Sequence, residues 1–109
     1  MRYFKAKILW KIPIRLIPPV LLQCDRKTMN AYMPIIVFEN QYDRPIFQNK
    51  IATVPLWSSV VFNERICGNM TLSSIKYLVD NAPYEFMRRG AKFELFEGGR
   101  LVATGEILD

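Results

Sequence analysis

The fold of this chain is decided by its final stretch, Lys92-Phe-Glu-Leu-Phe-Glu-Gly-Gly-Arg-Leu-Val-Ala-Thr-Gly-Glu-Ile-Leu108. Apolar and polar residues alternate on each side of the central Gly-Gly pair, which is the period of a half-buried β-strand. A tight turn between two antiparallel strands needs positive φ at its centre, and glycine adopts positive φ without a steric penalty. The stretch therefore predicts a β-hairpin.

Further strands are predicted by alternating or continuous apolar runs. Near the start of the chain, Phe4, Ala6, Ile8 and Trp10 alternate with lysines, so one face of that strand is expected to be buried. Other predicted strands cover residues 32–38, 51–56, 58–62 and 72–79, with a short one at 20–22. Residues 39–49 are predicted to form a long loop, 65–69 a turn, and 81–90 the connection to the final hairpin.

These strands favour an all-β fold, and we expect a small closed six-stranded antiparallel barrel because closure removes exposed strand edges. The interior of such a barrel is filled by side chains. The residues expected to fill it are Phe4, Ile8, Trp10, Val37, Ile75, Tyr77, Phe93, Leu95 and Val102. A length of 109 residues fits one domain, which we expect to cover residues 1–109.

The net charge of +5 is unevenly distributed, since residues 1–50 carry +6 and residues 51–109 carry −1. This asymmetry suits attraction to nucleic acid or to an acidic protein, but it is also an ordinary charge for solubility. Cys24 and Cys67 are predicted to be small buried apolar residues of a reduced, cytoplasmic protein. Prolines interrupt the basic and apolar start of the chain, so neither a signal peptide nor a membrane span is expected.

The absence of histidine from the sequence bears on catalysis. Histidine is the usual general base, the usual partner of a serine or cysteine nucleophile, and the commonest metal ligand. We therefore expect a protein that is not an enzyme and holds no cofactor or metal. Glu94 and Glu106 are candidates for an acid–base pair across the final hairpin, with ordinary exposed charges as the alternative.

Four segments resemble the C-terminal (third) β-barrel domain of the elongation factor Tu family, in the same order. They are Tyr3–Trp10, Tyr32–Phe38, Cys67–Leu72 and Arg89–Leu108, and the last contains the Glu97-Gly-Gly-Arg100 run. The resemblance covers roughly half of the chain and implies a stand-alone barrel of the translation-factor type. It does not extend to the GTPase activity, because the chain has no phosphate-binding loop and no nucleotide is expected.

The resemblance also implies a partner. In the elongation factor Tu family, the third domain helps to hold the T-stem of aminoacyl-tRNA and packs against the GTPase domain and the exchange factor. Glu97 and Gly98 match part of the family's tRNA contact, whereas Met33 and Ile35 stand where the family has an arginine and a glutamine. A surface that binds the backbone of RNA needs hydrogen-bond donors to phosphate and sugar. These two apolar residues therefore favour a partner other than tRNA, such as a protein.

The residues predicted to bind a partner are Arg88, Arg89, Lys92, Glu97, Gly98 and Arg100. The four cations among them are close in the sequence, and one hypothesis is that they cluster near the mouth of the final hairpin and contact phosphates. The alternative, which we favour from the sequence, is that they are solvated charges paired with Glu85, Glu94 or Glu97. Three aromatic residues in or near polar segments are expected either to stack on bases or anchor a protein, or else to cap the core: Tyr42, Phe47 and Trp57.

The sequence thus predicts a non-enzymatic binding module that engages a protein or RNA partner and requires neither a nucleotide nor a membrane. The alternative function is a toxin-neutralising protein of the immunity type on the same scaffold. A third hypothesis is a remnant that folds but binds nothing.

Overall fold

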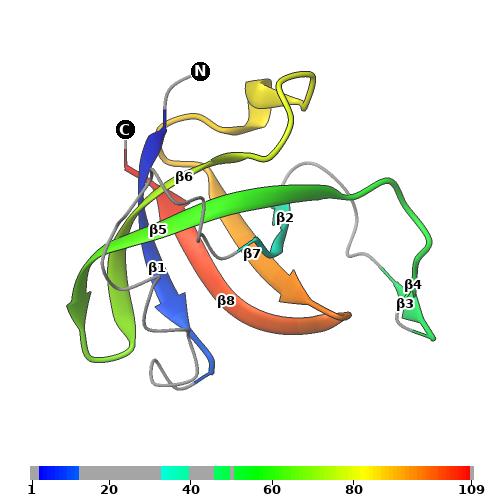
Figure 1. Ribbon diagram of the computed structural model, residues 1–109, viewed down its shortest axis with the longest axis horizontal. Helices are drawn as coiled ribbons and strands as arrows, with labels where there is room; N and C mark the ends of the chain where they lie inside the picture. The colour runs from blue at the N-terminus through cyan, green and yellow to red at the C-terminus, as the bar shows by residue number, and fades with distance from the viewer. Residues whose placement is uncertain (1–2, 13–32, 40–45, 50, 109) are drawn as a thin grey trace.

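The computed structural model describes residues 3–12, 33–39, 46–49 and 51–108. It shows a closed barrel in which each strand pairs antiparallel with its neighbours (Figure 1). Around the barrel the strands follow the order β1 (Phe4–Trp10), β6 (Met70–Tyr77), β5 (Trp57–Cys67), β2 (Ile35–Phe38), β7 (Lys92–Glu97) and β8 (Arg100–Ile107), which pairs back with β1. The predicted six-stranded antiparallel barrel is therefore confirmed.

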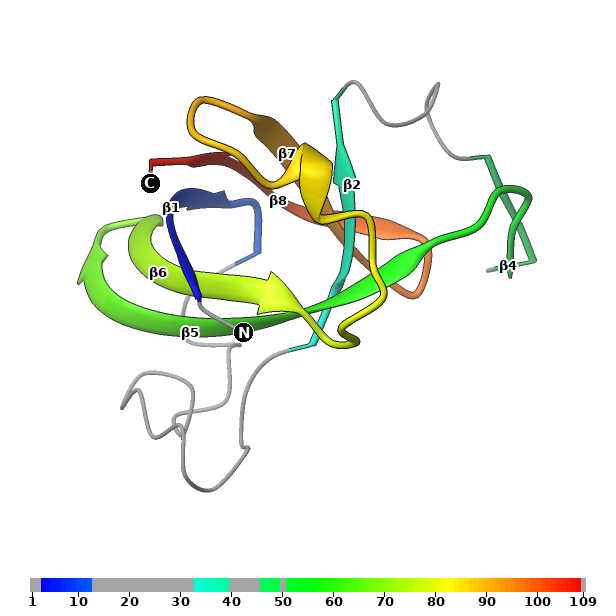
Figure 2. The same ribbon diagram turned by 90° about the horizontal axis from the view of Figure 1, so that it is seen from above.

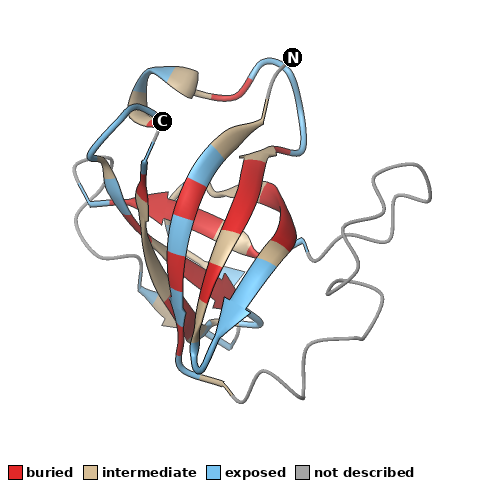
Figure 3. Cartoon of the chain, turned by 90° about the vertical axis from the view of Figure 1, so that its left-hand side faces the viewer, coloured by how far each residue is buried: buried red, intermediate tan, exposed pale blue. Residues whose placement is uncertain are grey.

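Strand β1 has the predicted alternation. Ala6, Ile8 and Trp10 are buried in the barrel, while Lys5 and Lys7 are exposed on its outside. Figure 3 shows the resulting bands of buried and exposed residues along the neighbouring strands. A period of two places one set of side chains on each face, so Lys5 and Lys7 lie on the outer face of this strand together with the exposed Leu9.

The final hairpin is also confirmed. Strands β7 and β8 pair antiparallel up to Glu97 and Arg100, and the turn between them is made by Gly98, with φ 58°, and Gly99, with φ 82°. Both glycines adopt the left-handed backbone region that is costly for residues with a Cβ. The two-residue turn sets the register next to it, and the register shifts once further along the hairpin, between Leu95 and Phe96.

The middle of the chain differs from the prediction. Instead of two short strands at 51–56 and 58–62, the chain forms the two-residue strand β4 (Ile51–Ala52) and then the long strand β5. Residues 65–67, predicted as part of a turn, belong to the end of β5, because a β-bulge between Asn63 and Arg65 shifts the register there. The bulge interrupts the alternation of buried and exposed side chains along β5. The polar residues around it therefore have a sequence pattern that is typical of a loop.

The predicted loop at 39–49 contains a short strand, β3 (Phe47–Gln48), which pairs with β4 outside the barrel. Figure 2 shows this small hairpin beyond the end of the barrel. The predicted strand at 72–79 is β6, which begins and ends two residues earlier. The strand predicted at residues 20–22 lies outside the described residues.

The core contains seven of the nine predicted residues: Ile8, Trp10, Ile75, Tyr77, Phe93, Leu95 and Val102. Phe4 is half-buried and packs against this core. Val37 was predicted to point into the barrel, and this was wrong. Ile36 and Phe38 belong to the interior cluster, so Val37, although buried, lies on the opposite face of β2. A run of consecutive apolar residues does not reveal which set faces inward.

A row of polar side chains occupies part of the barrel interior. The Trp10 indole N–H donates to the Thr71 hydroxyl at 2.8 Å, and the Thr71 and Ser73 hydroxyls are 2.9 Å apart. The Ser73 hydroxyl in turn donates to Asn63 Oδ1 at 2.8 Å. These residues are buried and have lost their contact with water, so each internal hydrogen bond offsets the free-energy cost of removing polar groups from water.

Candidate functional site

The structure separates the predicted site residues into two groups. Lys92 begins β7 and lies opposite Glu106 of β8 in the strand register. Arg100 lies opposite Glu97 in the register, at the other end of the same hairpin. At the usual strand rise, the length of β7 is roughly 17 Å. The expectation that all four cations cluster was therefore wrong for Arg100, because a hairpin separates residues that are near in sequence by the length of its strands.

We call Arg88, Arg89 and Lys92 the mouth patch, because they lie where the chain enters β7. We call Glu97, Gly98 and Arg100 the tip patch, because they surround the turn of the final hairpin. The charged residues of both patches are exposed. The two patches are described separately.

The backbone of the mouth patch is held by hydrogen bonds to two strands. The Gly90 N–H donates to the Ile107 carbonyl at 2.7 Å, and the Ile107 N–H donates to the Ala91 carbonyl at 2.9 Å. The Glu39 N–H at the end of β2 donates to the Lys92 carbonyl at 2.9 Å. These bonds fix the backbone of the segment that carries the three cations.

The chain reaches the mouth patch through one turn of 3₁₀ helix, η3 (Tyr84–Phe86). Met87, the next residue, is buried in the core and anchors this connection. Gly90 has φ 84°, a conformation in which a side chain would be strained. The buried Met87 and the left-handed Gly90 bracket the two arginines and leave them on the surface.

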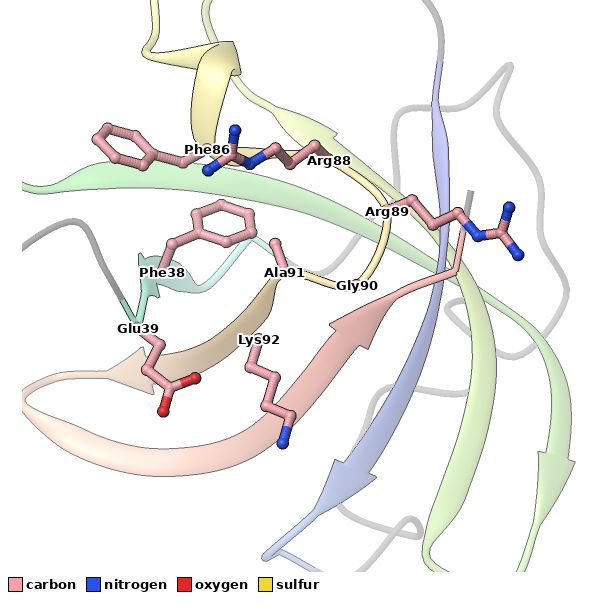
Figure 4. A pocket seen from close by; sticks show the side chains of 8 residues that line it. All are labelled: Phe38, Glu39, Phe86, Arg88, Arg89, Gly90, Ala91 and Lys92. Carbon is pink, nitrogen blue, oxygen red and sulfur yellow. The ribbon is translucent and has the colours of Figure 1, made fainter.

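A hollow of about 220 Å³ opens at the mouth patch. Its lining comprises Phe38, Glu39, Phe86, Arg88, Arg89, Gly90, Ala91 and Lys92 (Figure 4). Figure 4 shows the side chains of Phe86 and Arg88 on one side and those of Phe38, Glu39 and Lys92 on the other, with Arg89 directed away from Arg88. The hollow thus combines an aromatic lining with three cations and one carboxylate.

No ion pair joins the mouth-patch cations to a residue that the structure describes. Within those residues the one salt bridge lies elsewhere on the barrel, between Lys5 and Glu64 at 2.6 Å. The alternative prediction, in which the cations pair with Glu85, Glu94 or Glu97, is therefore not observed for Arg88, Arg89 or Lys92 in the described part of the chain.

The tip patch lies beside the small outer hairpin. Phe47 of β3 packs on Phe96 with ring centroids 5.3 Å apart, and a Cβ on Gly99 would lie 3.3 Å from the Phe47 ring. Phe47 thus packs against the Gly98-Gly99 turn. A Cβ on Gly98 would meet no heavy atom within 4 Å, so the surface there is open.

The predicted aromatic residues take structural positions. Trp57 is half-buried against the core, with its ring 6.5 Å from that of Tyr77, and Phe47 contacts Phe96 as described. These contacts match the interpretation in which the aromatic residues cap or support the core. Tyr42 lies outside the described residues.

The two predicted acids do not face each other directly. Glu106 lies opposite Lys92 on one neighbouring strand and opposite Lys7 on the other, while Glu94 lies opposite Thr104. Among the described residues, no group of three or more His, Cys, Asp or Glu side chains is arranged to hold a metal ion. The registers therefore place Glu106 in a row of alternating charges on the outer face of the barrel.

Cys67 was wrongly predicted to be buried. It ends β5 at the turn with β6 and is an exposed free thiol. The side chain falls outside the barrel because the hairpin extends beyond the core there. Cys24 lies outside the described residues.

Five lining residues of the hollow had not been predicted as site residues: Phe38, Glu39, Phe86, Gly90 and Ala91. Phe38 and Glu39 reach the mouth patch because β2 pairs with β7, a contact between segments far apart in the sequence. Only a correct pairing of the strands would have found them. Phe86 is close to the arginines in the sequence, and an apolar residue before a basic pair was the available signal.

Comparisons with models of protein families, with curated proteins and with solved structures found no match to this chain. In the described residues, no helix has the length and apolar character needed to cross a membrane. The candidate site therefore has to be interpreted from its own geometry and charge.

Proposed function

We propose that this protein is a non-enzymatic binding module that engages an anionic partner, an RNA or the acidic surface of a protein, through the mouth patch. The observation that carries the proposal is the arrangement of Arg88, Arg89 and Lys92 around one hollow with no ion pair to any described residue. Cations that lack internal partners gain most from an external anion.

The ordered backbone of the mouth supports the proposal. Its hydrogen bonds to β2 and β8 hold the backbone of the cationic residues in place, so binding orders the side chains and leaves the backbone almost unchanged. The resemblance to the third domain of elongation factor Tu adds a translation-related RNA or protein to the candidate partners. A toxin-neutralising protein would be another such module, one that covers an acidic active site.

The test is direct binding of two anionic probes, a labelled mixed-sequence RNA and a labelled polyglutamate peptide, over a range of salt concentrations. A triple variant, Arg88→Glu, Arg89→Glu and Lys92→Glu, should lose at least about tenfold in affinity for the probe that binds, because attraction becomes repulsion. The single variant Arg89→Glu has a matched control in Arg65→Glu, which reverses one charge at an exposed position near the far end of β5. If the triple variant binds like the wild type, the mouth is not the site.

A further inference from the structure

We infer that the hollow at the mouth takes the base of one unpaired nucleotide of a single-stranded RNA, whose phosphates lie on the mouth-patch cations. This inference rests on the proposed function and specifies the partner. It depends on the size of the hollow, on its aromatic lining and on the one carboxylate within it.

The size of the hollow favours one unit of a polymer. Clefts that hold a whole small molecule usually measure roughly 300–1,000 Å³. At about 220 Å³ the hollow is smaller, and it suits a single planar base whose neighbouring nucleotides remain outside. The cations at its rim then meet the phosphates on either side of that base.

The aromatic lining supplies a surface for stacking. Phe86 is only half-buried, so part of its side chain is accessible, and Arg88 lines the same hollow (Figure 4). Phe38 is buried and held by Phe93, with ring centroids 5.6 Å apart, so it forms a rigid wall. Bases stack on phenyl rings and on guanidinium planes, and they do so when they are not already stacked in a duplex.

The carboxylate distinguishes a base from an acidic side chain. Glu39 lines the hollow, is exposed and supplies its one carboxylate. An aspartate or glutamate of a protein partner would be repelled by it, whereas the amino group of adenine, cytosine or guanine would donate a hydrogen bond to it. The hollow therefore suits the base, and its cationic rim suits the phosphate.

Four fluorescent probes test this inference by anisotropy: a short single-stranded RNA, its duplex with the complementary strand, an abasic strand with the same number of phosphates, and polyglutamate. We expect the single strand to bind roughly 5- to 150-fold more tightly than the abasic strand, the range that stacking of one base provides. Phe86→Leu keeps an apolar side chain at this position but removes the ring. It should lower binding of the single strand toward that of the abasic strand and leave binding of the abasic strand unchanged.

The outcomes separate this inference from the proposed function. Equal binding of single, duplex and abasic strands would overturn the base-binding inference and leave a binding module that recognises phosphates alone. Preference for polyglutamate would also overturn it, in favour of an acidic protein. An unchanged preference in Phe86→Leu would show that the base lies elsewhere, and failure of all four probes to bind would overturn the proposed function itself.

Discussion

The ring of Phe93 fills the space that a side chain at Gly105 would need. A Cβ on Gly105 would lie 2.3 Å from Phe93 Cζ and 3.0 Å from the Lys7 carbonyl oxygen. The two residues are directly opposite each other in the β7–β8 pair, and Phe93 is buried against Phe38. An aromatic ring over a cross-strand glycine covers backbone that would otherwise pack poorly.

This relationship predicts that Gly105→Ala is destabilising, although alanine suits a strand backbone better than glycine. The free energy of unfolding should fall by about 1–3 kcal/mol, because the Phe93 ring has to move within a packed core. Chemical denaturation measures the change. In a Phe93→Leu background the same substitution should cost less, and equal costs in both backgrounds would show that the two residues are not coupled.

The hydrogen bond from Trp10 to Thr71 gives a second prediction. Thr71→Val keeps the shape of the side chain but leaves the buried indole N–H without its acceptor, and it also removes the neighbour of the Ser73 hydroxyl. The free energy of unfolding should fall by about 1–3 kcal/mol. Thr71→Ser retains the hydroxyl and is the matched control. Equal losses in the two variants would attribute the effect to packing of the methyl group instead.

Tyr84 gives a prediction about alkaline pH. Burial is the main cause that raises the pKa of its phenol above the ordinary value of 10.0, and Asp80 and Tyr3 also raise it. The neutral hydroxyl donates a hydrogen bond to the Tyr77 carbonyl. The folded state therefore keeps this proton to higher pH than the unfolded chain does. The resulting contribution to stability is constant at neutral pH and falls as pH rises above 10.0.

Tyr84→Phe removes that titration, so the stability of the variant should fall less steeply than that of the wild type above pH 10.0. The comparison uses the slope of unfolding free energy against pH, because loss of the hydrogen bond shifts the variant by a similar amount at every pH below that range. Parallel slopes would mean that Tyr84 titrates alike in the folded and unfolded states.

The strands that the sequence predicted correctly are those in which the local pattern of residues matches the pairing with neighbouring strands. Strand β1 keeps a strict alternation, and Gly98 and Gly99 mark the turn of the last hairpin, so both were predicted correctly. The prediction failed in β5, where the bulge after Asn63 places a polar stretch inside a strand. A bulge is decided by pairing with the neighbouring strand, and local sequence carries little information about it.

The candidate site was predictable only in part, for the same reason. Arg88, Arg89 and Lys92 do lie at one mouth of the barrel, but Arg100 lies at the opposite end of β7. Glu39 enters the hollow through the pairing of β2 with β7. Closeness in the sequence was therefore enough to predict that the cations of one segment lie together. The residues that a distant strand contributes could be predicted only from the pairing of the strands.

The two patches of the final hairpin allow the resemblance and the geometry to be tested against each other. Binding in the manner of the elongation factor Tu third domain would use the tip patch, whereas the hollow and the cations without ion pairs to described residues lie at the mouth. We expect Arg89→Gln to weaken binding of single-stranded RNA and to reduce the salt slope by about 0.7, the value for one lost phosphate contact. Arg100→Gln removes the same charge at the other end of β7, beside the turn of the hairpin, and we expect it to leave both the affinity and the slope as in the wild type. The reverse result, with the loss in Arg100→Gln alone, would place the partner at the tip and favour the manner of binding that the resemblance implies.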